Sequence, residues 1–310
     1  MSPELRAVED PTAHVPAFRM RGLSLGYDDR TVVREVDLDI PHGCTTVLIG
    51  ANGCGKTTLL KGLSRQLRPS AGTLEADGRD VREWRARPYA RSVSLLPQSP
   101  VVPEGLTVVE LVERGRHPHR RWWGAPSPDD DAAVARAMEL TELTALASRP
   151  VEELSGGQRQ RVWIALTLAQ RARTMLLDEP TSYLDLAHQV DLLDMLRGLE
   201  HADGPGSGRA TVVAVLHELN LAARVADRLV AMAAGRIVAV GTPAEVLTPD
   251  LLAEVFDLRA DVARDPVGGR PVVLPRGRAR EGSHPAPAAA PVALDPAPRA
   301  AVAETGRNLL

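Results

Sequence analysis

The sequence predicts an α/β protein with a largely parallel central sheet, and two observations carry this prediction. Short apolar runs at 46–49, 174–177 and 211–216 are separated by segments whose apolar residues recur at helical spacing. One such segment follows a glycine-rich loop at 50–58, and another spans about 186–199. Strands that alternate with helices form parallel sheets with helices on both faces. We therefore expect a doubly covered parallel sheet at the centre of the fold.

An antiparallel β segment and a helical segment accompany this core. Residues 17–27 and 31–41 alternate in part between apolar and polar side chains, and residues 72–78 end in an Asp-Gly turn. Such segments favour strands joined by tight turns. From about residue 98 to residue 161, apolar residues instead recur every three or four positions. We predict an N-terminal antiparallel β subdomain and an α-helical subdomain inserted at about 98–161.

The C-terminal third contains a predicted hairpin and two predicted helix starts. Residues 228–241 fit a β-hairpin that turns at Ala234 and Gly235. Thr242 and Thr248 each precede a proline, which is typical of a capped helix with proline in its first turn. These signals extend the folded part of the chain well beyond residue 248.

Composition sets the domain boundaries. Residues 1–15 contain prolines and acidic residues but no apolar stretch, so we expect a flexible N-terminus without a signal peptide. From residue 276 onward the chain is rich in proline and alanine and has almost no large apolar residues, which predicts a disordered tail at 276–310. The folded unit is predicted at 16–275, with a flexible loop at 201–209.

Charge and composition narrow the class of function. The chain has 310 residues, 44% of them hydrophobic, and a formal net charge of −3. This slightly negative net charge provides no general attraction to nucleic acid, so we expect no nucleic acid partner. No apolar run approaches the roughly 18 residues of a membrane-spanning helix. Cys44 and Cys54 lack the spacing of a metal site or a disulfide framework, so we expect an intracellular protein.

The loop at 50–58 carries the strongest functional signal. It matches G-x-x-x-x-G-K-[ST] between a strand and a helix, the context that a nucleotide-binding P-loop requires. Glycines let the backbone wrap around phosphates, and amide groups at a helix N-terminus attract the negative charge. Lys56 is expected to reach the β- and γ-phosphates of ATP, and Thr57 to ligate Mg²⁺. We predict a P-loop NTPase core of the RecA-like type. The expected nucleotide-binding residues of the loop are Gly50, Ala51, Asn52, Gly53, Cys54, Gly55, Lys56, Thr57 and Thr58.

An acidic pair follows the apolar run at 174–177. Asp178, at the carboxyl end of a strand, is expected to hold Mg²⁺ beside the phosphates. Glu179 is then placed to orient or deprotonate the attacking water. An isolated acidic pair would more often be surface charge, but the preceding P-loop favours the catalytic interpretation.

The motif at 154–158 identifies a family. It resembles the LSGGQ signature of ABC transporter nucleotide-binding subunits and precedes a helical segment. The resemblance implies that the signature contacts the γ-phosphate of ATP bound to the opposite subunit, so that two copies of the chain complete two sites. A plain helix N-cap is the alternative interpretation. The signature residues are Leu154, Ser155, Gly156, Gly157 and Gln158.

Further residues match landmarks of this family in the expected order. Gln98 resembles the Q-loop glutamine that contacts Mg²⁺ and the lytic water, and His217 resembles the switch histidine that contacts the γ-phosphate. Tyr27 resembles the aromatic residue that stacks on adenine. Asp185 lies in a D-loop-like segment in which Tyr183 stands where alanine is more usual. Taken alone, such a histidine or tyrosine is more often structural. The resemblance implies catalytic roles for Glu179, His217, Gln98 and Lys56, and Mg²⁺ contacts from Thr57, Gln98 and Asp178.

Finer resemblance points to one group within the family. Segments at 112–119, 162–170, 181–186 and 216–222 look like those of importers for ferric siderophores, haem and vitamin B12. This implies an ATPase subunit, peripheral to the cytoplasmic side of the cell membrane, that drives uptake of a ferric siderophore or related iron chelate. The implied partners are integral membrane permease subunits, a second copy of the chain and, indirectly, an extracytoplasmic substrate-binding protein. A non-transport ABC ATPase of the iron–sulfur assembly type and an ABC exporter subunit are the alternatives.

The basic stretch at 114–123 allows three interpretations. Its charges could belong to a solvated loop. A metal site at His117 and His119 is disfavoured, because no acidic or thiol side chain accompanies them. We favour a docking surface for the permease, since arginine and tryptophan, here Trp122 and Trp123, are enriched at interface hot spots.

Overall fold

The computed structural model describes most of the predicted folded unit. The predicted N-terminus, the tail and the loop at 201–209 lie largely outside the described residues, as do Trp122 and Trp123. The described residues are 15–28, 30–98, 100, 104–120, 127–199 and 209–279.

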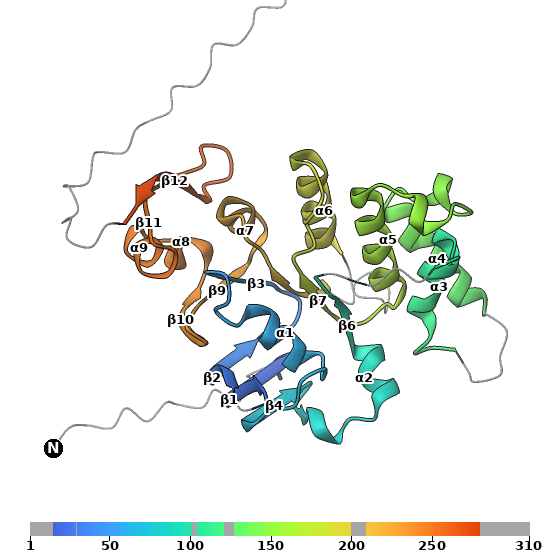
Figure 1. Cartoon of the computed structure of the whole chain (residues 1–310), viewed down its shortest axis with the longest axis horizontal. Coiled ribbons are helices and arrows are strands. Elements are labelled where there is room, and N and C mark those ends of the chain that lie inside the picture. The colour runs from blue at the N-terminus through green and yellow to red at the C-terminus, as the bar shows by residue number, and fades with distance from the viewer. Residues whose placement is uncertain are drawn as a thin grey trace, which may run out of the picture.

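A six-stranded sheet with the order β10-β9-β3-β8-β7-β6 forms the centre of the molecule (Figure 1). Five of its strands are parallel, and β10 is an antiparallel edge strand. The predicted parallel sheet is therefore confirmed. Its strands are β3 (Thr45–Gly50), β6 (Val93–Leu96), β7 (Thr174–Asp178), β8 (Thr211–Val215), β9 (Arg228–Ala233) and β10 (Arg236–Gly241).

Helices cover both faces of this sheet. Successive residues of each strand point to opposite sides, so each strand contributes side chains to both helical layers. In β3, Val47 and Ile49 join the apolar cluster beneath α6 (Leu186–Gly198) and α7 (Leu219–Val225), whereas Leu48 joins the cluster around α1 (Lys56–Leu63). Strands that are buried on both faces have continuous apolar sequences. This is the pattern from which the parallel sheet was predicted.

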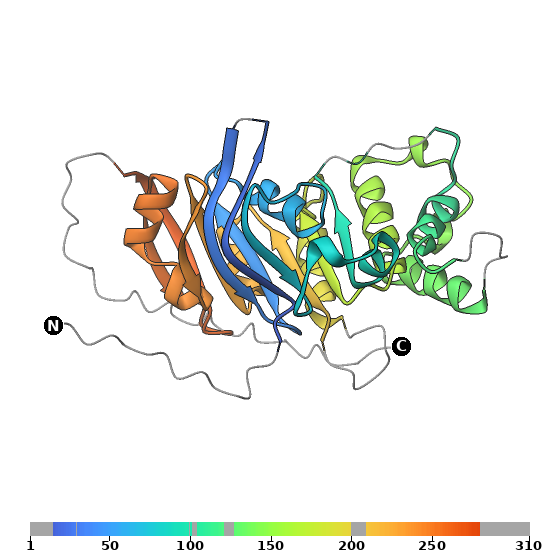
Figure 2. The same ribbon diagram turned by 90° about the horizontal axis from the view of Figure 1, so that it is seen from below.

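A second sheet, with the order β2-β1-β4-β5, packs on the other side of α1 (Figure 2). All its pairings are antiparallel, which confirms the predicted N-terminal β subdomain. Gly62 of α1 allows a close approach, because a Cβ there would lie 2.5 Å from Cδ1 of Leu25. The strands are β1 (Phe18–Tyr27), β2 (Arg30–Ile40), β4 (Ala71–Ala76) and β5 (Arg79–Asp80), followed by the 3-10 turn η1 (Val81–Glu83) and α2 (Ala86–Ser92).

The helical subdomain lies at one end of the molecule and has its own apolar core (Figures 1 and 2). Its last helix extends past the predicted boundary at residue 161 to Ala169 and packs along β6. The helices are α3 (Val108–Glu113), α4 (Pro128–Leu140) and α5 (Gly156–Ala169), with 3-10 turns η2 (Arg114–Arg116), η3 (Thr144–Leu146) and η4 (Val151–Glu153).

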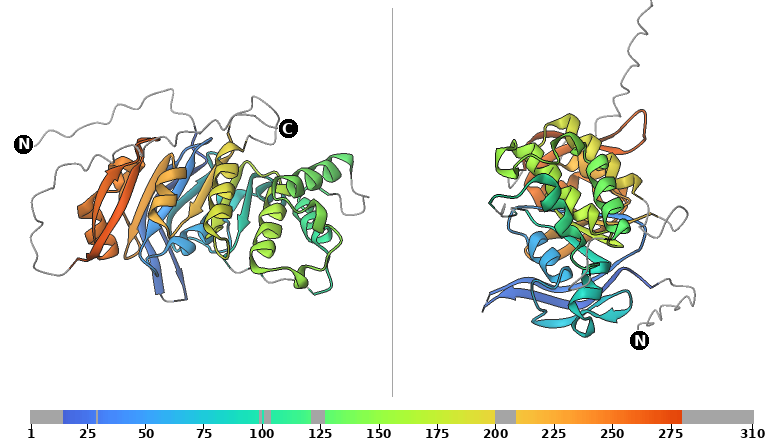
Figure 3. Two further views of the ribbon diagram at one scale, coloured as in Figure 1. Left: turned by 90° about the horizontal axis from the view of Figure 1, so that it is seen from above. Right: turned by 90° about the vertical axis from the view of Figure 1, so that its right-hand side faces the viewer.

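The C-terminal part lies at the opposite end (Figure 3). The predicted hairpin at 228–241 and the two predicted helix starts are confirmed by β9, β10, α8 (Pro243–Val246) and α9 (Pro249–Phe256). A further hairpin, β11 (Leu258–Arg264) and β12 (Pro271–Arg278), was not predicted. Because β12 continues through Arg278, the tail does not begin at residue 276. The exposed pair Arg276–Asp261, at 2.7 Å, joins the hairpin's two strands.

None of the helices in the described ranges has both the length and the apolar character needed to cross a bilayer.

Arg116 corrects part of the docking prediction for 114–123. Its side chain is only 2% exposed. The guanidinium Nε donates to Asp130 Oδ1 at 2.8 Å, and Nη1 donates to the carbonyl of Ala169 at 2.9 Å. Arg116 therefore joins η2, α4 and α5 and is not available to a partner.

Replacing Arg116 with methionine should destabilise the protein by about 3–5 kcal/mol, because the buried carboxylate of Asp130 would lose its counter-charge. Urea unfolding at neutral pH measures this loss. Arg136→Met, which breaks an exposed pair with Glu139, should cost less than about 1 kcal/mol. Equal losses in the two variants would contradict the assignment.

The pH dependence provides an independent check. Burial acts to raise the pKa of Asp130, but hydrogen bonds from Arg116 and Ser127 outweigh burial and lower it to about 2. An unperturbed aspartate has a pKa of about 3.9. The stability contributed by this ionised carboxylate is therefore complete above about pH 4 and is lost as the pH falls toward 2. In Arg116→Met/Asp130→Asn, this contribution to the loss at low pH should disappear.

Candidate active site

The loop between β3 and α1 is closely wrapped. Gly50 has φ 150° and Gly55 has φ 110°. A Cβ on Gly50 would lie 2.3 Å from the carbonyl oxygen of Met232, so no larger residue fits there. Lys56 Nζ donates to the carbonyls of Gly50 at 2.8 Å and Ala51 at 3.1 Å, which curls the side chain back over the loop.

The turn between β9 and β10 braces this loop. Gly235 N–H donates to the Cys54 carbonyl at 3.0 Å, and the Gly235 carbonyl accepts from Arg34 N–H at 2.8 Å. Gly235 has φ 82°, and a Cβ there would lie 2.1 Å from the carbonyl oxygen of Val32. The loop at 50–58 is thus held between β2 and the β9–β10 turn. Cys54 is buried and contributes its backbone to this contact.

Asp178 ends β7 directly beside the start of α1. Its Oδ1 accepts a hydrogen bond from the Thr57 hydroxyl at 3.1 Å. Burial raises the pKa of the Asp178 carboxyl, since the charged form loses hydration. The two residues predicted from separate motifs, 121 positions apart, therefore form one oxygen-rich corner.

Glu179 is held by two of the other predicted catalytic side chains, Gln98 and His217. Its Oε1 accepts from Gln98 Nε2 at 2.8 Å and lies 2.5 Å from His217 Nε2. The three residues follow the carboxyl ends of β7, β6 and β8, which are neighbours in the sheet. Glu179 also has φ 54°, a left-handed conformation that costs a non-glycine residue free energy and is concentrated at functional sites.

These residues line one cavity of about 1030 Å³. Tyr27 borders it at the end of β1, with Lys61 Nζ 5.5 Å from the ring centroid. The sequence analysis missed three residues that follow Tyr27 and also line the cavity: Asp28, Arg30 and Val32. Their position just after Tyr27, at the end of a predicted strand, was the sequence feature that could have indicated them. The predicted lining residues are Tyr27, Asn52, Gly53, Gly55, Lys56, Thr57, Thr58, Gln98, Glu179 and His217, whereas Gly50, Ala51 and Cys54 shape the loop behind them.

Comparison with known proteins decides the family. The family model described as "ABC transporter" matches residues 33–182. The ferric enterobactin transport ATP-binding protein FepC of Escherichia coli is 45% identical over 267 residues, which cover 86% of this chain and 97% of that protein. This chain belongs to the ABC transporter family.

Two further similarities support membership of the ABC transporter family. The achromobactin transport ATP-binding protein CbrD of Dickeya dadantii is 46% identical over 262 residues, covering 84% of this chain and 96% of that protein. A solved inward-facing structure described as a metal-chelate type ABC transporter matches with a TM-score of 0.70 and 29% identity, covering 84% of this chain and 97% of the matched chain. The match thus extends through nearly all of the folded unit.

The predicted signature residues at 154–158 lie outside the large cavity. Ser155 caps α5: its hydroxyl accepts from Gln158 N–H at 3.2 Å, and Gln158 Oε1 accepts from Ser155 N–H at 3.0 Å. Gly156 lines a separate hollow of about 270 Å³, together with Gln98 and Tyr183. Leu154 is buried in the helical core. Gly157 lies close to the backbone of Tyr183, because a Cβ on Gly157 would lie 3.2 Å from the Tyr183 carbonyl oxygen.

Asp185, the predicted D-loop residue, is also outside the large cavity. It caps α6 by accepting from His188 N–H at 2.9 Å, and its Oδ1 lies 2.6 Å from His188 Nδ1. The single chain therefore brings together the loop at 50–58, Gln98, Asp178, Glu179 and His217, but not the signature or the D-loop.

Replacing Tyr27 with alanine should raise the KM for ATP about tenfold, because stacking of an aromatic side chain on a base contributes about 1–3 kcal/mol. Steady-state hydrolysis over a range of ATP concentrations measures this change. Tyr27→Phe keeps the ring and should leave KM within twofold of the unmodified protein. A normal KM in Tyr27→Ala would show that the ring does not contact the nucleotide.

Proposed function

We propose that this chain is the ATP-hydrolysing subunit of an ABC importer, and that it energises uptake of a ferric siderophore or related iron chelate through a separate membrane permease. The observation that carries the proposal is identity of 45–46% along nearly the whole length of relatives named for ferric enterobactin and achromobactin transport. The cavity at the carboxyl ends of β3, β6, β7 and β8 supplies the groups for hydrolysis.

ATP binding uses the loop at 50–58 and the side chain of Tyr27. Backbone amides at the start of α1 bind the phosphates of ATP. The ammonium group of Lys56 exchanges its hydrogen bonds to the carbonyls of Gly50 and Ala51 for contacts with the negatively charged phosphates. The Tyr27 ring stacks on adenine at the other end of the cavity. The bound nucleotide thus extends from the end of β1 toward the end of β7.

Hydrolysis uses Glu179. Gln98 and His217 both hold its Oε1, which fixes the carboxylate at the edge of the cavity. From there it can accept a proton from water that attacks the γ-phosphate. His217 also lines the cavity, where its ring can contact the γ-phosphate.

The residues present fit a Mg²⁺ ion. Thr57 Oγ1 and Asp178 Oδ1 are 3.1 Å apart, and both residues line a hollow of about 240 Å³ together with Gln98. Oxygen donors of this kind suit Mg²⁺, which commonly binds one or two carboxylates together with substrate phosphates. These three residues would hold the ion, and the ion would supply positive charge to the phosphates.

The working unit is proposed to be a homodimer at the cytoplasmic face of the membrane. Ser155 and Gly156 lie outside the chain's own nucleotide cavity, so a second copy would have to supply a signature to each ATP. The permease would bind this dimer, and a substrate-binding protein would deliver the chelate from outside the cell.

The alternatives differ in cargo and direction rather than in the hydrolytic residues. An iron–sulfur assembly ATPase or an exporter subunit could use the same cavity. Uptake of radiolabelled ferric siderophore should be lost in cells without this protein and restored by the unmodified chain, but not by Lys56→Ala. Normal uptake in the deficient cells would overturn the proposed cargo.

Replacing Glu179 with glutamine should lower kcat for ATP about a hundredfold or more while ATP binding persists, because the amide cannot accept the proton. The variant should also accumulate as an ATP-bound dimer, seen as a doubled mass in solution. Glu139→Gln, an exposed change on α4, is the matched control and should behave as the unmodified protein. A monomeric Glu179→Gln that hydrolyses ATP normally would contradict the assignment.

A further inference from the structure

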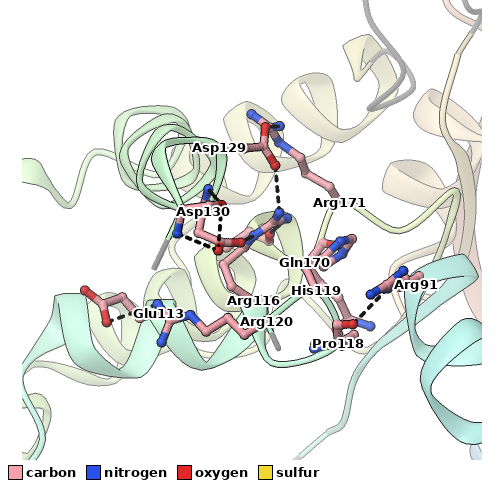
Figure 4. Close-up of polar contacts among 12 residues, drawn as sticks. Arg91, Glu113, Arg116, Pro118, His119, Arg120, Asp129, Asp130, Gln170 and Arg171 are labelled. Carbon is pink, nitrogen blue, oxygen red and sulfur yellow. Dashed lines mark hydrogen bonds and ion pairs between the residues drawn. The ribbon is translucent and has the colours of Figure 1, made fainter. Parts of the chain in front are cut away.

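The C-terminal end of the signature helix α5 is bound by side chains from the 116–119 segment (Figure 4). The carbonyl of Ala169 accepts from Arg116 Nη1 at 2.9 Å, and the carbonyl of Gln170 accepts from His119 Nε2 at 2.8 Å. The last carbonyls of a helix have no partners within the helix, so such contacts stabilise its end. Burial lowers the pKa of His119, which keeps the ring neutral with Nε2 as the donor.

The side chain of Gln170 ties the same helix end to the catalytic core. Its Nε2 donates to the carbonyl of Ala90 at 2.5 Å and to that of Val93 at 3.2 Å. Ala90 lies in α2, and Val93 is the first residue of β6. A parallel contact joins Arg91 Nε to the carbonyl of Pro118 at 2.8 Å. Gln170 is therefore held from both sides, with its carbonyl bound by the helical subdomain and its carboxamide bound to the core.

The two elements joined at this end meet again at the site. From Val93, β6 leads to Gln98, which binds Glu179; from Gln170, α5 leads back to the signature. Gln98 and Gly156 line the same hollow of about 270 Å³. The relative position of the Q-loop and the signature thus depends on how α5 is fixed along β6.

The length of α5 makes its far end sensitive to this anchor. Fourteen residues at about 1.5 Å each give a helix about 21 Å long. A tilt of about 5° at the Gln170 end would move Ser155 by roughly 2 Å over that length. A misplacement of about 1 Å, caused by a mutation far from the chemistry, can cost about a hundredfold in rate.

We propose that Gln170 is a positioning residue for ATP hydrolysis: it holds the C-terminal end of α5 against the start of β6 and so sets the position of Ser155 relative to Gln98. This inference rests on the proposed function, in which the signature serves ATP. Gln170 does not line the large cavity, so it would act by fixing the end of α5 and not by direct contact with ATP.

The test replaces Gln170 with methionine, which keeps the length of the side chain but removes both hydrogen bonds to the core. We expect kcat to fall about tenfold while KM for ATP changes less than twofold, because no residue of α5 lines the cavity that holds Tyr27 and the loop at 50–58. Hydrolysis is measured well below the unfolding temperature, with binding of a fluorescent ATP analogue as a second readout. A purely structural role would lower the unfolding temperature without separating kcat from KM.

Arg171→Met is the matched control. Arg171 is the next residue along the chain and donates to Asp129 Oδ1 at 2.8 Å within the helical subdomain. Its loss should leave kcat within twofold. If Gln170→Met does not fold, His119→Phe tests the same helix end without changing Gln170, and it should lower kcat at constant KM.

Three results would overturn the proposal: normal kcat in the folded Gln170→Met variant or in its substitute His119→Phe, an equal loss in Arg171→Met, or a rise in KM that accounts for the loss of activity. Absence of ATP hydrolysis by the unmodified protein, in contrast, would overturn the proposed function itself. The two failures are therefore distinguishable in one set of assays.

Discussion

The parallel register of the central strands determines where Gln98, Asp178, Glu179 and His217 lie. Leu177 of β7 is opposite Leu96 of β6, and Asp178 is opposite Val215 of β8. Because the strands share one direction, the residues that follow them emerge at one edge of the sheet, where ligands of open α/β sheets bind. Shifting one strand by a single residue would exchange its two faces and remove the residue that follows it from this group. The left-handed backbone of Glu179 is supported within this register by the hydrogen bond from Glu179 N–H to the Val215 carbonyl, at 3.2 Å.

The helical subdomain contributes in a different way. Among the described residues, none from α3 to α5 lines the large cavity, and the apolar core of these helices is separate from the two cores of the central sheet. The subdomain is joined to the central part of the molecule by the hydrogen bonds of Gln170 at the end of α5. At the other end of α5, Gly156 and Gln98 line one hollow. A helix fixed at its two ends transmits position along its length. The chemistry of the site and the placement of the signature therefore depend on different interactions.

The sequence predicted best what is local. The motif at 50–58 and the helix start at the 154–158 motif each lie within a few residues of chain, so the sequence alone indicates them. The contact of the loop with Gly235 does not follow from that motif. Arg116 was misinterpreted because its partners Asp130 and Ala169 lie 14 and 53 positions away. A charged stretch gives no sign of which of its members are buried. The β11–β12 hairpin was missed for a different reason: its strands are partly exposed and lack a clear alternation of apolar residues.

The burial of an arginine beside the end of α5 has a physical reason. An apolar side chain of similar volume could pack there, and replacement of a buried ion pair by apolar residues is often neutral or stabilising. Methionine at position 116, however, would leave the carbonyl of Ala169 and the carboxylate of Asp130 without this donor. The guanidinium is planar, and its donors have fixed directions, so it joins η2, α4 and α5 in one arrangement. The same arrangement places His119 against the carbonyl of Gln170 and leaves the carboxamide of Gln170 to bind the core. The ion pair can thus add little net stability and still restrict how α5 lies against α4 and η2.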